Sequence, residues 1–299
     1  MTTAVLIDAD TLVYQAAWSA EDSIQWDESL FTNTAELSEG IEKFDHLVKT
    51  FQEGLSADLV VLALSNYDRP WRKELDRQYK AQRDKAVRKP LLRDPLRAYI
   101  HERSGEAWEV FERPTLEGDD VLGILMTSRR IRAGRKVCVS IDKDLKTVPG
   151  LHLNYTAALE RPDHMESLIF EVTEEEADRW HLLQTLAGDP TDEYPGCPGV
   201  GMKRAARFLD EGRVFEKVEH TFKSGPRKGQ TETRWIQGRE GAPWEIIVSL
   251  FESKGLTEED ALRNARVARI CRASDYDFKT KEVRLWTPTP SGRPDHVGP

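Results

Sequence analysis

The chain has 299 residues, of which 39% are hydrophobic and 32% charged, and its formal net charge at pH 7 is −9. That balance is typical of a soluble globular protein with one large or two modest domains, and it argues against a protein that coats nucleic acid nonspecifically. No apolar run approaches the ~20 residues that cross a bilayer. The three cysteines form no CxxC pair, which argues against a zinc site or a disulfide framework. We expect a cytoplasmic protein with no membrane partner.

The first half of the chain alternates short apolar runs with stretches of helical spacing. Strands are expected at residues 4–7, 59–64, 108–111, 136–141 and 151–155. Helices are expected at 11–18, 37–55, 90–103 and from the acidic cluster near 118 to about 132, and the polar residues 20–35 are expected to form a loop. Strands that alternate with helices predict an α/β fold, a mostly parallel central sheet with helices on both faces.

The second half of the chain has a mainly helical pattern. Helices are expected at residues 173–186, 202–210, 242–255 and 257–271, a small hairpin around the basic loop 223–229, and a late strand at 281–286. We therefore predict a core at residues 1–172, a helical region at 173–286, and a disordered Pro- and Gly-rich tail at 287–299.

Acidic side chains recur in four short clusters on separate expected elements. The clusters are Asp8/Asp10, Glu117/Asp119/Asp120, Asp142/Asp144 and Asp189/Asp192. Glu117 and Asp120 share a face if both are helical, and the first pair, two residues apart after a strand, is expected to point one way. The helix macrodipole favours one or two acids at a helix start, but it does not explain four clusters. Crowded carboxylates are costly without cations, so the sequence predicts a divalent-metal site outside the carboxyl ends of the strands.

Residues 69–93 form a basic segment, with ten Lys or Arg residues against three acids. Its cations Arg72, Lys73, Arg77, Lys80, Arg83 and Lys85 are spaced to line one or two faces of a helix. A run of charges is usually only a solvated surface, but the acidic background of the chain favours contact with phosphate. Trp71 and Tyr79 either stack on single-stranded bases or anchor the segment to the core.

A glycine-rich turn precedes the helix expected at residue 202. Gly196, Gly199 and Gly201 allow tight backbone turns, and Lys203 adds a positive charge to the helix start. Together they predict an anion site suited to one strand of a nucleic-acid backbone, without sequence preference. The alternative is an ordinary corner between two helices.

A phosphatase interpretation is less favoured. Residues 7–12 approach the DxDGT start of haloacid-dehalogenase-type phosphatases, and residues 188–192 approach their GDxxxD motif, but each misses the spacing by one residue. That interpretation also leaves the glycine turn unexplained.

Five motifs in order carry a family resemblance. They are IDAD at 7–10, YKAQR at 79–83, LEGDDVLG at 116–123, SIDKDL at 140–145 and GDPTDEYPGCPGVGMKRA at 188–205. Over residues 4–287 the chain resembles the flap endonuclease / 5′-3′ exonuclease family, and WRKEL at 71–75 and EVRLW at 282–286 look most like its members in T7-like bacteriophages. The resemblance implies a PIN-like nuclease core with an arch-like segment at 69–93 and a helix-three-turn-helix at 188–210.

The resemblance also implies roles for individual residues. The first metal site would use Asp8, Glu117 and Asp119 with Asp120 beside them, and the second Asp142, Asp144 and Asp192 with Asp189 in support. Asp10 stands where many members have a small or hydroxyl residue. Tyr14 would stack on a terminal base, and Lys80 and Arg83 would contact the scissile phosphate. Where the family has an Asp after the second strand, this chain has Asn66, followed by Asp68, and either could supply that contact.

The implied reaction is a two-metal hydrolysis of duplex DNA from 5′ ends, using two Mg²⁺ ions that Mn²⁺ can replace, with K⁺ at the glycine turn. Removal of RNA from RNA–DNA hybrids and cleavage of 5′ flaps would fit the same site, and phage DNA replication or host DNA degradation would be the setting. The alternatives are a structure-specific flap endonuclease without strong exonuclease activity, a non-catalytic DNA-end-binding protein, and an endoribonuclease of the wider PIN group. The glycine turn and the basic segment argue against the last of these.

Overall fold

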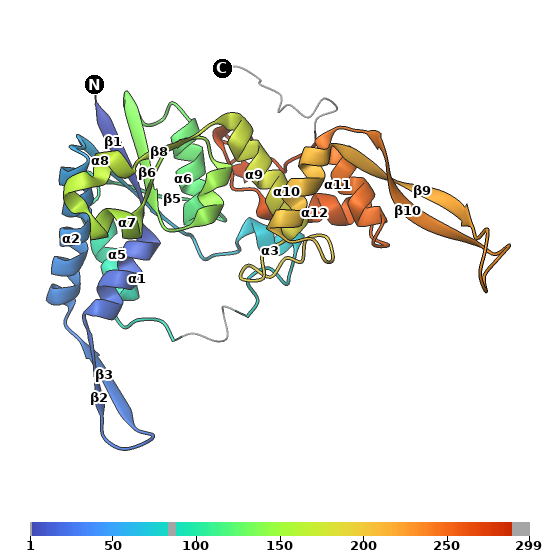
Figure 1. The fold of residues 1–299 in the computed structure, drawn as a ribbon. Coiled ribbons are helices and arrows are strands. Elements are labelled where there is room, and N and C mark those ends of the chain that lie inside the picture. Colours follow the sequence, from blue (N-terminus) through green and yellow to red (C-terminus); the bar gives the residue numbers. More distant parts are fainter. Residues whose placement is uncertain (1, 83–87, 289–299) are drawn as a thin grey trace. The chain divides into compact units, whose positions relative to one another are not determined.

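The computed structural model describes residues 2–82 and 88–288, and the chain divides into two compact units (Figure 1). The first unit comprises Met1–Trp71, Gln82–Ala177 and Ile270–Arg284, and the second comprises Arg72–Ala81, Asp178–Arg269 and Leu285–Pro299. A single boundary near residue 172 therefore does not describe the division. Arg83, Lys85 and the end of the predicted tail lie outside the described residues.

A six-stranded sheet forms the centre of the first unit, in the order β5-β4-β1-β6-β7-β8. Its strands are β1 (Thr3–Asp8), β4 (Leu59–Leu64), β5 (Glu109–Glu112), β6 (Arg135–Ser140), β7 (Gly150–Asn154) and β8 (Phe170–Val172). All neighbouring strands pair in parallel except β8, which runs antiparallel to β7. The predicted mostly parallel sheet is confirmed, and β8 is an addition that the sequence pattern did not indicate.

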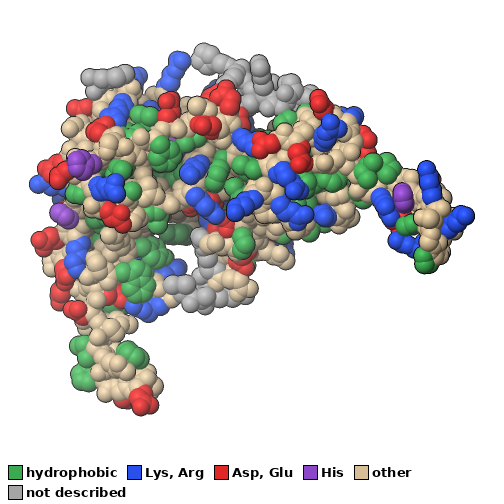
Figure 2. Space-filling model, viewed as in Figure 1, with side chains coloured by type: hydrophobic (Ala, Val, Ile, Leu, Met, Phe, Trp, Pro, Cys, Tyr) green, Lys and Arg blue, Asp and Glu red, His purple; other side chains and the backbone are tan. Residues whose placement is uncertain are grey.

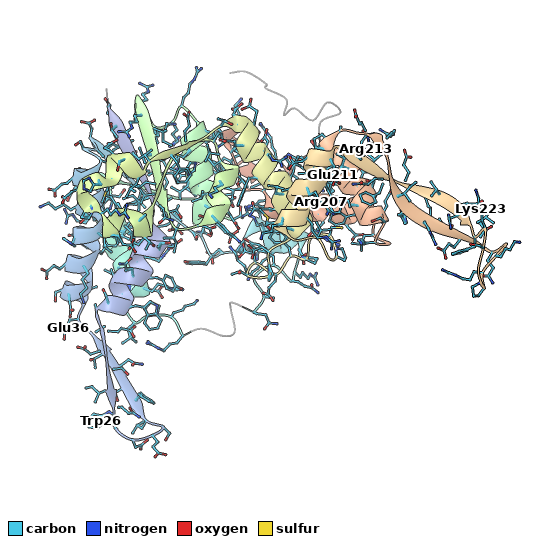
Figure 3. The ribbon with its side chains drawn as sticks, in the orientation of Figure 1. Trp26, Glu36, Arg207, Glu211, Arg213 and Lys223 are labelled. Carbon is cyan, nitrogen blue, oxygen red and sulfur yellow. The ribbon has the colours of Figure 1, made fainter. Side chains whose placement is uncertain are left out.

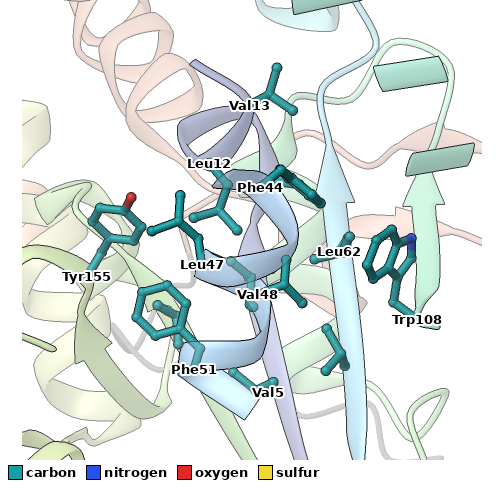
Figure 4. Close-up of a cluster of buried hydrophobic side chains, with 14 of the residues drawn as sticks. Val5, Leu12, Val13, Phe44, Leu47, Val48, Phe51, Leu62, Trp108 and Tyr155 are labelled. Carbon is teal, nitrogen blue, oxygen red and sulfur yellow. The ribbon is translucent and has the colours of Figure 1, made fainter. Parts of the chain in front are cut away.

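Alternate residues of each strand point to opposite faces of the sheet, and both sets are buried. Val5 and Ile7 of β1 lie in a core with Phe44 and Phe51 (Figure 4). That core includes residues of α1 (Ala9–Ser19), α2 (Leu37–Gly54) and α5 (Arg93–Glu102). On the opposite face of the sheet, Leu6 is also fully buried. Helix α6 (Gly118–Thr127) contacts β1, β4, β5 and β6. Burying one such apolar side chain contributes roughly 1.5–3 kcal/mol.

Residues 20–35 form a β-hairpin, so the predicted loop is wrong. The hairpin consists of β2 (Glu21–Gln25) and β3 (Phe31–Ala35), and it projects from α1 and α2 in Figure 1. The Asp27 side chain accepts hydrogen bonds from the backbone N–H groups of Ser29 and Leu30, both at 2.8 Å, which fixes the turn. Trp26 is 65% exposed at the tip. The strands lack an apolar alternation because most of their side chains face solvent.

The remaining elements of the first unit are short. They are α7 (Tyr155–Glu160), α8 (Met165–Leu168), the 3₁₀ turns η1 (Lys143–Thr147), η2 (Pro162–His164) and η3 (Ala273–Asp275), and the strands β11 (Tyr276–Asp277) and β12 (Glu282–Val283). The late strand predicted at 281–286 is therefore only two residues long. Helix α6 also ends earlier than the predicted residue 132.

The second unit is mainly helical and has one long hairpin. Its helices are most of α9 (Glu174–Ala187), α10 (Met202–Glu211), α11 (Pro243–Glu252) and α12 (Glu258–Ala268), and its hairpin pairs β9 (Arg213–Thr221) with β10 (Thr231–Glu240). Leu186, Ile247 and Phe251 are fully buried in its core or nearly so. The predicted helices and hairpin are confirmed, with shifted ends. In the described residues 69–82 of the basic segment, the five-residue α3 (Trp71–Leu75) is followed by turns through residue 82, so no single helix runs over that stretch. None of the helices in the described part of the chain is long and apolar enough to cross a membrane.

Candidate metal centre and nucleic-acid-binding surface

Several carboxylates meet at the edge of the first unit where the parallel strands end. Asp8 is the last residue of β1, and its carboxylate caps α1 by accepting hydrogen bonds from the Thr11 N–H at 3.3 Å and the Thr11 hydroxyl at 2.5 Å. On the neighbouring strand β6, the Ser140 hydroxyl lies 3.5 Å from Asp8 and accepts a bond from the Asp142 N–H at 3.0 Å. The ends of β1 and β6 are thus joined through one serine.

The start of α6 is tied to the same edge through the end of β4. The Gly118 N–H donates to the Ser65 hydroxyl at 2.8 Å, and Ser65 follows the last residue of β4. Glu117 precedes the helix in an extended conformation and Asp119 lies in its first turn, both half-buried. These contacts bring three of the four acidic clusters to one edge of the sheet, whereas Asp189 and Asp192 belong to the second unit.

The electrostatics of this edge reflect the crowding. The pKa of Asp8 is raised to about 6, mainly by burial and then by the charges of Asp10 and Asp142, against the lowering effect of the hydrogen bonds from Thr11. Burial also raises the pKa of the Cys138 thiol on β6, with smaller contributions from Asp119 and Asp8. Four carboxylates from α1, β1, α6 and the end of β6 therefore act on one another or on a shared neighbour.

The donor set fits a hard divalent cation. Carboxylates whose mutual repulsion disfavours ionisation gain from a bound cation, and oxygen ligands without His or Cys suit Mg²⁺, which keeps several waters. Within residues 2–82 and 88–288, no group of three or more His, Cys, Asp or Glu side chains is already closed around a metal position.

Asp142 and Asp144 occupy a short turn after β6. Asp142 caps η1, and its carboxylate accepts a hydrogen bond from the Asp144 N–H at 2.7 Å. Asp142 is exposed and Asp144 is half-buried. Both residues follow the carboxyl end of a parallel strand, as predicted, and this local bond orders the turn that carries them.

Asp10 differs from the prediction because it lies in the first turn of α1 and not on the strand. Its carboxylate accepts hydrogen bonds from the Ser65 N–H at 2.8 Å, from the Tyr67 hydroxyl at 3.2 Å and from Arg97. Protein donors therefore use both of its oxygens, and the period-two argument for its direction is wrong. No local pattern indicates Arg97 or Tyr67, because their contacts with Asp10 come from segments distant in sequence.

Asp120 is fully buried, so the prediction that it lines a metal site together with Glu117 is wrong. Its carboxylate accepts hydrogen bonds from the Trp71 indole N–H at 2.9 Å and the Cys271 N–H at 3.0 Å, and from the Glu117 N–H at 3.3 Å. Asp120 thus caps α6 and joins it to two distant segments of the first unit. Trp71 is an anchor of the core, which settles one of its two predicted roles.

The second unit holds the remaining acidic cluster. Asp189 is buried and accepts a hydrogen bond from the Thr191 N–H at 2.7 Å. The Asp192 carboxylate lies 3.5 Å from the Lys80 ammonium and accepts a hydrogen bond from the Tyr79 hydroxyl at 3.3 Å. Lys80 also lies 4.8 Å from the centre of the Tyr79 ring.

Two predicted DNA contacts in the basic segment are wrong. The guanidinium of Arg72 is buried and donates to the carbonyl oxygens of Val267 at 2.9 Å and Arg269 at 2.5 Å. Tyr79 is buried as well, so it anchors the segment and cannot stack on a base. Lys73 is half-buried, and Tyr14 on α1 is half-buried too.

The first polar residues after β4 include Asn66 and Asp68, the two candidates for the contact that follows the second strand. The Asn66 amide donates to Glu112 at 2.9 Å, and its oxygen accepts from the Asp68 N–H at 3.1 Å. Asn66 is therefore engaged with β5, and Asp68 is exposed.

The glycine turn consists of one packed glycine and two open ones. Gly196 has φ +63°, donates its N–H to Asn264 at 2.9 Å, and has no room for a Cβ atom, which would lie 2.3 Å from the Gly188 nitrogen. Gly199 and Gly201 are exposed, and Gly201 caps α10. Lys203 is exposed at the start of that helix, beside Arg204, which was not among the predicted site residues. The Arg204 guanidinium donates to the Gly199 carbonyl at 2.7 Å.

The chain is similar in sequence to known nucleases. The family model described as the 5′-3′ exonuclease N-terminal resolvase-like domain matches residues 3–177. The chain is 35% identical to an exodeoxyribonuclease of Enterobacteria phage T3 over 95% of this chain and 92% of that protein. It is likewise 35% identical to an exonuclease of Escherichia phage T7, over 95% of this chain and 93% of that protein.

Solved structures share the fold. The T5 D15 protein co-crystallised with metal ions has a TM-score of 0.54 at 15% identity, over 89% of this chain and 88% of that chain. The bacteriophage T5 D15 flap endonuclease in a complex with DNA and metal ions has a TM-score of 0.52 at 14% identity, with the same coverage. The family match and the two phage relatives together show that this chain belongs to the 5′-3′ exonuclease family.

Proposed function

We propose that the protein is a divalent-metal-dependent 5′-3′ exonuclease that hydrolyses the phosphodiester bonds of duplex DNA from 5′ ends. The observation that carries the proposal is the crowded carboxylate edge, where the pKa of Asp8 is raised to about 6 by burial and by neighbouring acids. A fold has no structural need for such crowding, whereas phosphoryl chemistry with Mg²⁺ requires it. Membership of the 5′-3′ exonuclease family and 35% identity to phage exonucleases support the substrate and the direction.

The proposed metal ligands come from separate elements. Asp8, Glu117 and Asp119 would hold one ion. Asp142, Asp144 and Asp192 would hold a second, with Asp189 in support, as the family resemblance implies. When bound, the two ions supply activation of water and neutralisation of charge at the leaving oxygen. Asp10 and Asp120 would act as positioning residues, since Asp10 fixes the end of β4 through Ser65 and Asp120 fixes the start of α6.

The basic segment would act on the scissile phosphate. Lys80, with Arg83, would place positive charge where the transition state spreads negative charge over the phosphoryl oxygens. The ion pair between Lys80 and Asp192 keeps that ammonium beside a proposed metal ligand. Tyr14 would stack on the terminal base, and Asp68 would supply the contact after β4, because the Asn66 amide is engaged with Glu112.

The substrate backbone would bind at the glycine turn. The open backbone at Gly199 and Gly201, the positive end of α10, and the exposed Lys203 and Arg204 form a surface for phosphate, and K⁺ could be held by carbonyl oxygens there. RNA–DNA hybrids and 5′ flaps are further proposed substrates, and phage DNA replication or host DNA degradation in the host cytoplasm is the proposed setting.

The test is a time course on a 5′-labelled blunt duplex beside a 5′-flap substrate, with Mg²⁺, with Mn²⁺ and with EDTA. We expect early release of labelled mononucleotide from the blunt duplex, only with a divalent ion. Release of an intact flap with the blunt duplex spared would instead identify a structure-specific endonuclease. Binding without cleavage of either substrate would contradict the nuclease function and leave a DNA-end-binding protein.

A further inference from the structure

Among the described residues, the β9–β10 hairpin of the second unit is anchored only at its base. Val214 is buried, and the Phe215 N–H donates to the Ser249 hydroxyl of α11 at 2.9 Å. Beyond this base the residues are exposed or half-buried as far as the turn and back (Figure 1). An isolated two-stranded hairpin is marginally stable in water, so a long one that projects from its domain requires a functional explanation.

The outer end of this hairpin is a cationic surface. Residues 222–230 contain Lys223, Arg227 and Lys228 and no acid, in a chain whose net charge is −9. Figure 3 places Lys223 at the outer end and Arg213 at the base, and Figure 2 shows Lys and Arg side chains gathered there. Among the residues that the structure describes, no carboxylate pairs with Lys223 or Lys228, whereas Arg227 pairs with Glu232 at 2.9 Å.

The hairpin end is also a well-defined platform. The Phe222 N–H donates to the Gln230 carbonyl at 3.0 Å, and the Gly229 N–H donates to the Phe222 carbonyl at 2.9 Å. The Arg227 guanidinium lies over the Phe222 ring, 3.9 Å from its centre. Gly225 has φ +75° with open space around it, so the backbone turn and not packing requires this glycine. These contacts order the backbone of the turn and the Arg227 side chain, and Lys223, Arg227 and Lys228 stay exposed.

The dimensions suit duplex DNA. Strand β9 has nine residues, which at ~3.3 Å per residue span about 30 Å. A two-stranded ribbon is narrow enough to enter the major groove or to lie along the backbone of B-form DNA. Helix α10 connects the glycine turn to β9 through Gly212, so one continuous stretch carries Lys203 at its start and Lys223 beyond its end.

We propose that the β9–β10 hairpin is an accessory arm that binds the phosphate backbone of duplex DNA at a distance from the glycine turn. The inference rests on the proposed nuclease function and adds a second, separate contact with the same substrate. The contact is electrostatic and independent of base sequence, and it slows dissociation between successive cleavages.

The test compares two triple variants that each remove three positive charges. The arm variant is Lys223→Ala, Arg227→Ala and Lys228→Ala, and the control is Lys49→Ala, Arg129→Ala and Arg132→Ala, at exposed sites of the first unit. Binding of a 40-base-pair duplex is measured with EDTA present, over a range of salt concentrations. We expect the arm variant to bind about tenfold more weakly at moderate salt and to lose about 2–3 units of slope in log K against log salt.

A second variant guards against misfolding of the turn. Thr221 and Thr231 are directly paired, so residues 222–230 can be replaced by Asn-Gly, which closes a two-residue hairpin turn. We expect this variant to match the triple variant in binding while its single-turnover cleavage rate at saturating enzyme equals that of the unaltered protein.

Three results decide the proposal. Affinity and salt slope within twofold of the control for both arm variants, in a protein that binds and cuts DNA, would overturn the arm alone. An unaltered protein that neither binds nor cuts DNA would overturn the proposed function and the arm together. Weaker binding by both arm variants with the control unchanged would support the arm.

Discussion

The acidic edge of the first unit and the basic surfaces of the second unit handle charge in opposite ways. At the sheet edge, Asp8 and Asp119 are half-buried among like charges, and the pKa of Asp8 is raised to about 6. On the second unit, Lys203, Arg204 and Lys223 are exposed to water. Crowding like charges lowers the stability of the metal-free fold, whereas exposed cations affect it little. The difference separates residues arranged for chemistry from residues arranged for affinity.

The largest effect is expected at Asp144. Asp144→Asn removes a proposed metal ligand while preserving its size and the backbone bond that orders the turn. We expect turnover to fall by about 10³-fold or more, the scale on which an essential catalytic group acts. The melting temperature and the affinity for duplex in EDTA should stay close to those of an Asp163→Asn control in an exposed turn. An unfolded variant would assign Asp144 a structural role.

Lys80 is an exception to this division, because it belongs to the second unit but is proposed to act in the chemistry. Lys80→Ala should lower kcat by about 10²–10³-fold, as expected for loss of a charge that stabilises the transition state. Lys80→Arg should restore part of that loss. A rise in KM with kcat unchanged would place Lys80 among the residues that only bind DNA.

Variants of the glycine turn test whether the exposed cations of the second unit contribute to affinity alone. The double variant Lys203→Ala and Arg204→Ala should weaken duplex binding about tenfold and lower the salt slope by about 2 units, since each lost phosphate contact removes about one unit. Cleavage at saturating enzyme should be unchanged. A slower single-turnover rate would show that these cations also position the scissile phosphate.

The smallest effect is one on stability and has the opposite sign to the effect on activity. Because the folded state raises the pKa of Asp8 from 3.8 to about 6, it binds a proton more tightly than the unfolded state. Stability of the metal-free protein should therefore fall as pH rises from about 4 through 6. Asp8→Asn, which can still cap α1, should abolish activity yet raise the melting temperature in EDTA at pH 7.5 by a few degrees. A lower melting temperature for this variant would contradict the crowding.

The sequence indicated the sheet edge well because its signals are local. The apolar runs of β1 and β6 end directly before Asp8 and Asp142, so strand assignment alone placed these residues at one edge. Hairpin 21–35 was not predictable, because strands exposed on both faces show no apolar alternation.

The burial of two predicted site residues could not be predicted from local sequence patterns either. Asp120 is enclosed by Trp71 and Cys271, and Arg72 by the carbonyls of Val267 and Arg269, all of them distant in sequence. Their residue types suit a metal or phosphate site equally well. Only tertiary contacts distinguish a buried cap from a ligand.

The most direct test of the division between chemistry and affinity measures both quantities on the same variants. Single-turnover cleavage of a 5′-labelled duplex in Mg²⁺ and equilibrium binding of that duplex in EDTA are compared for Asp144→Asn and for the Lys203→Ala, Arg204→Ala double variant. We predict that the first variant loses cleavage with its Kd within about threefold of the unaltered protein, and that the second loses affinity with its cleavage rate retained at saturation. Parallel loss of both quantities in either variant, or normal cleavage by Asp144→Asn, would contradict the division.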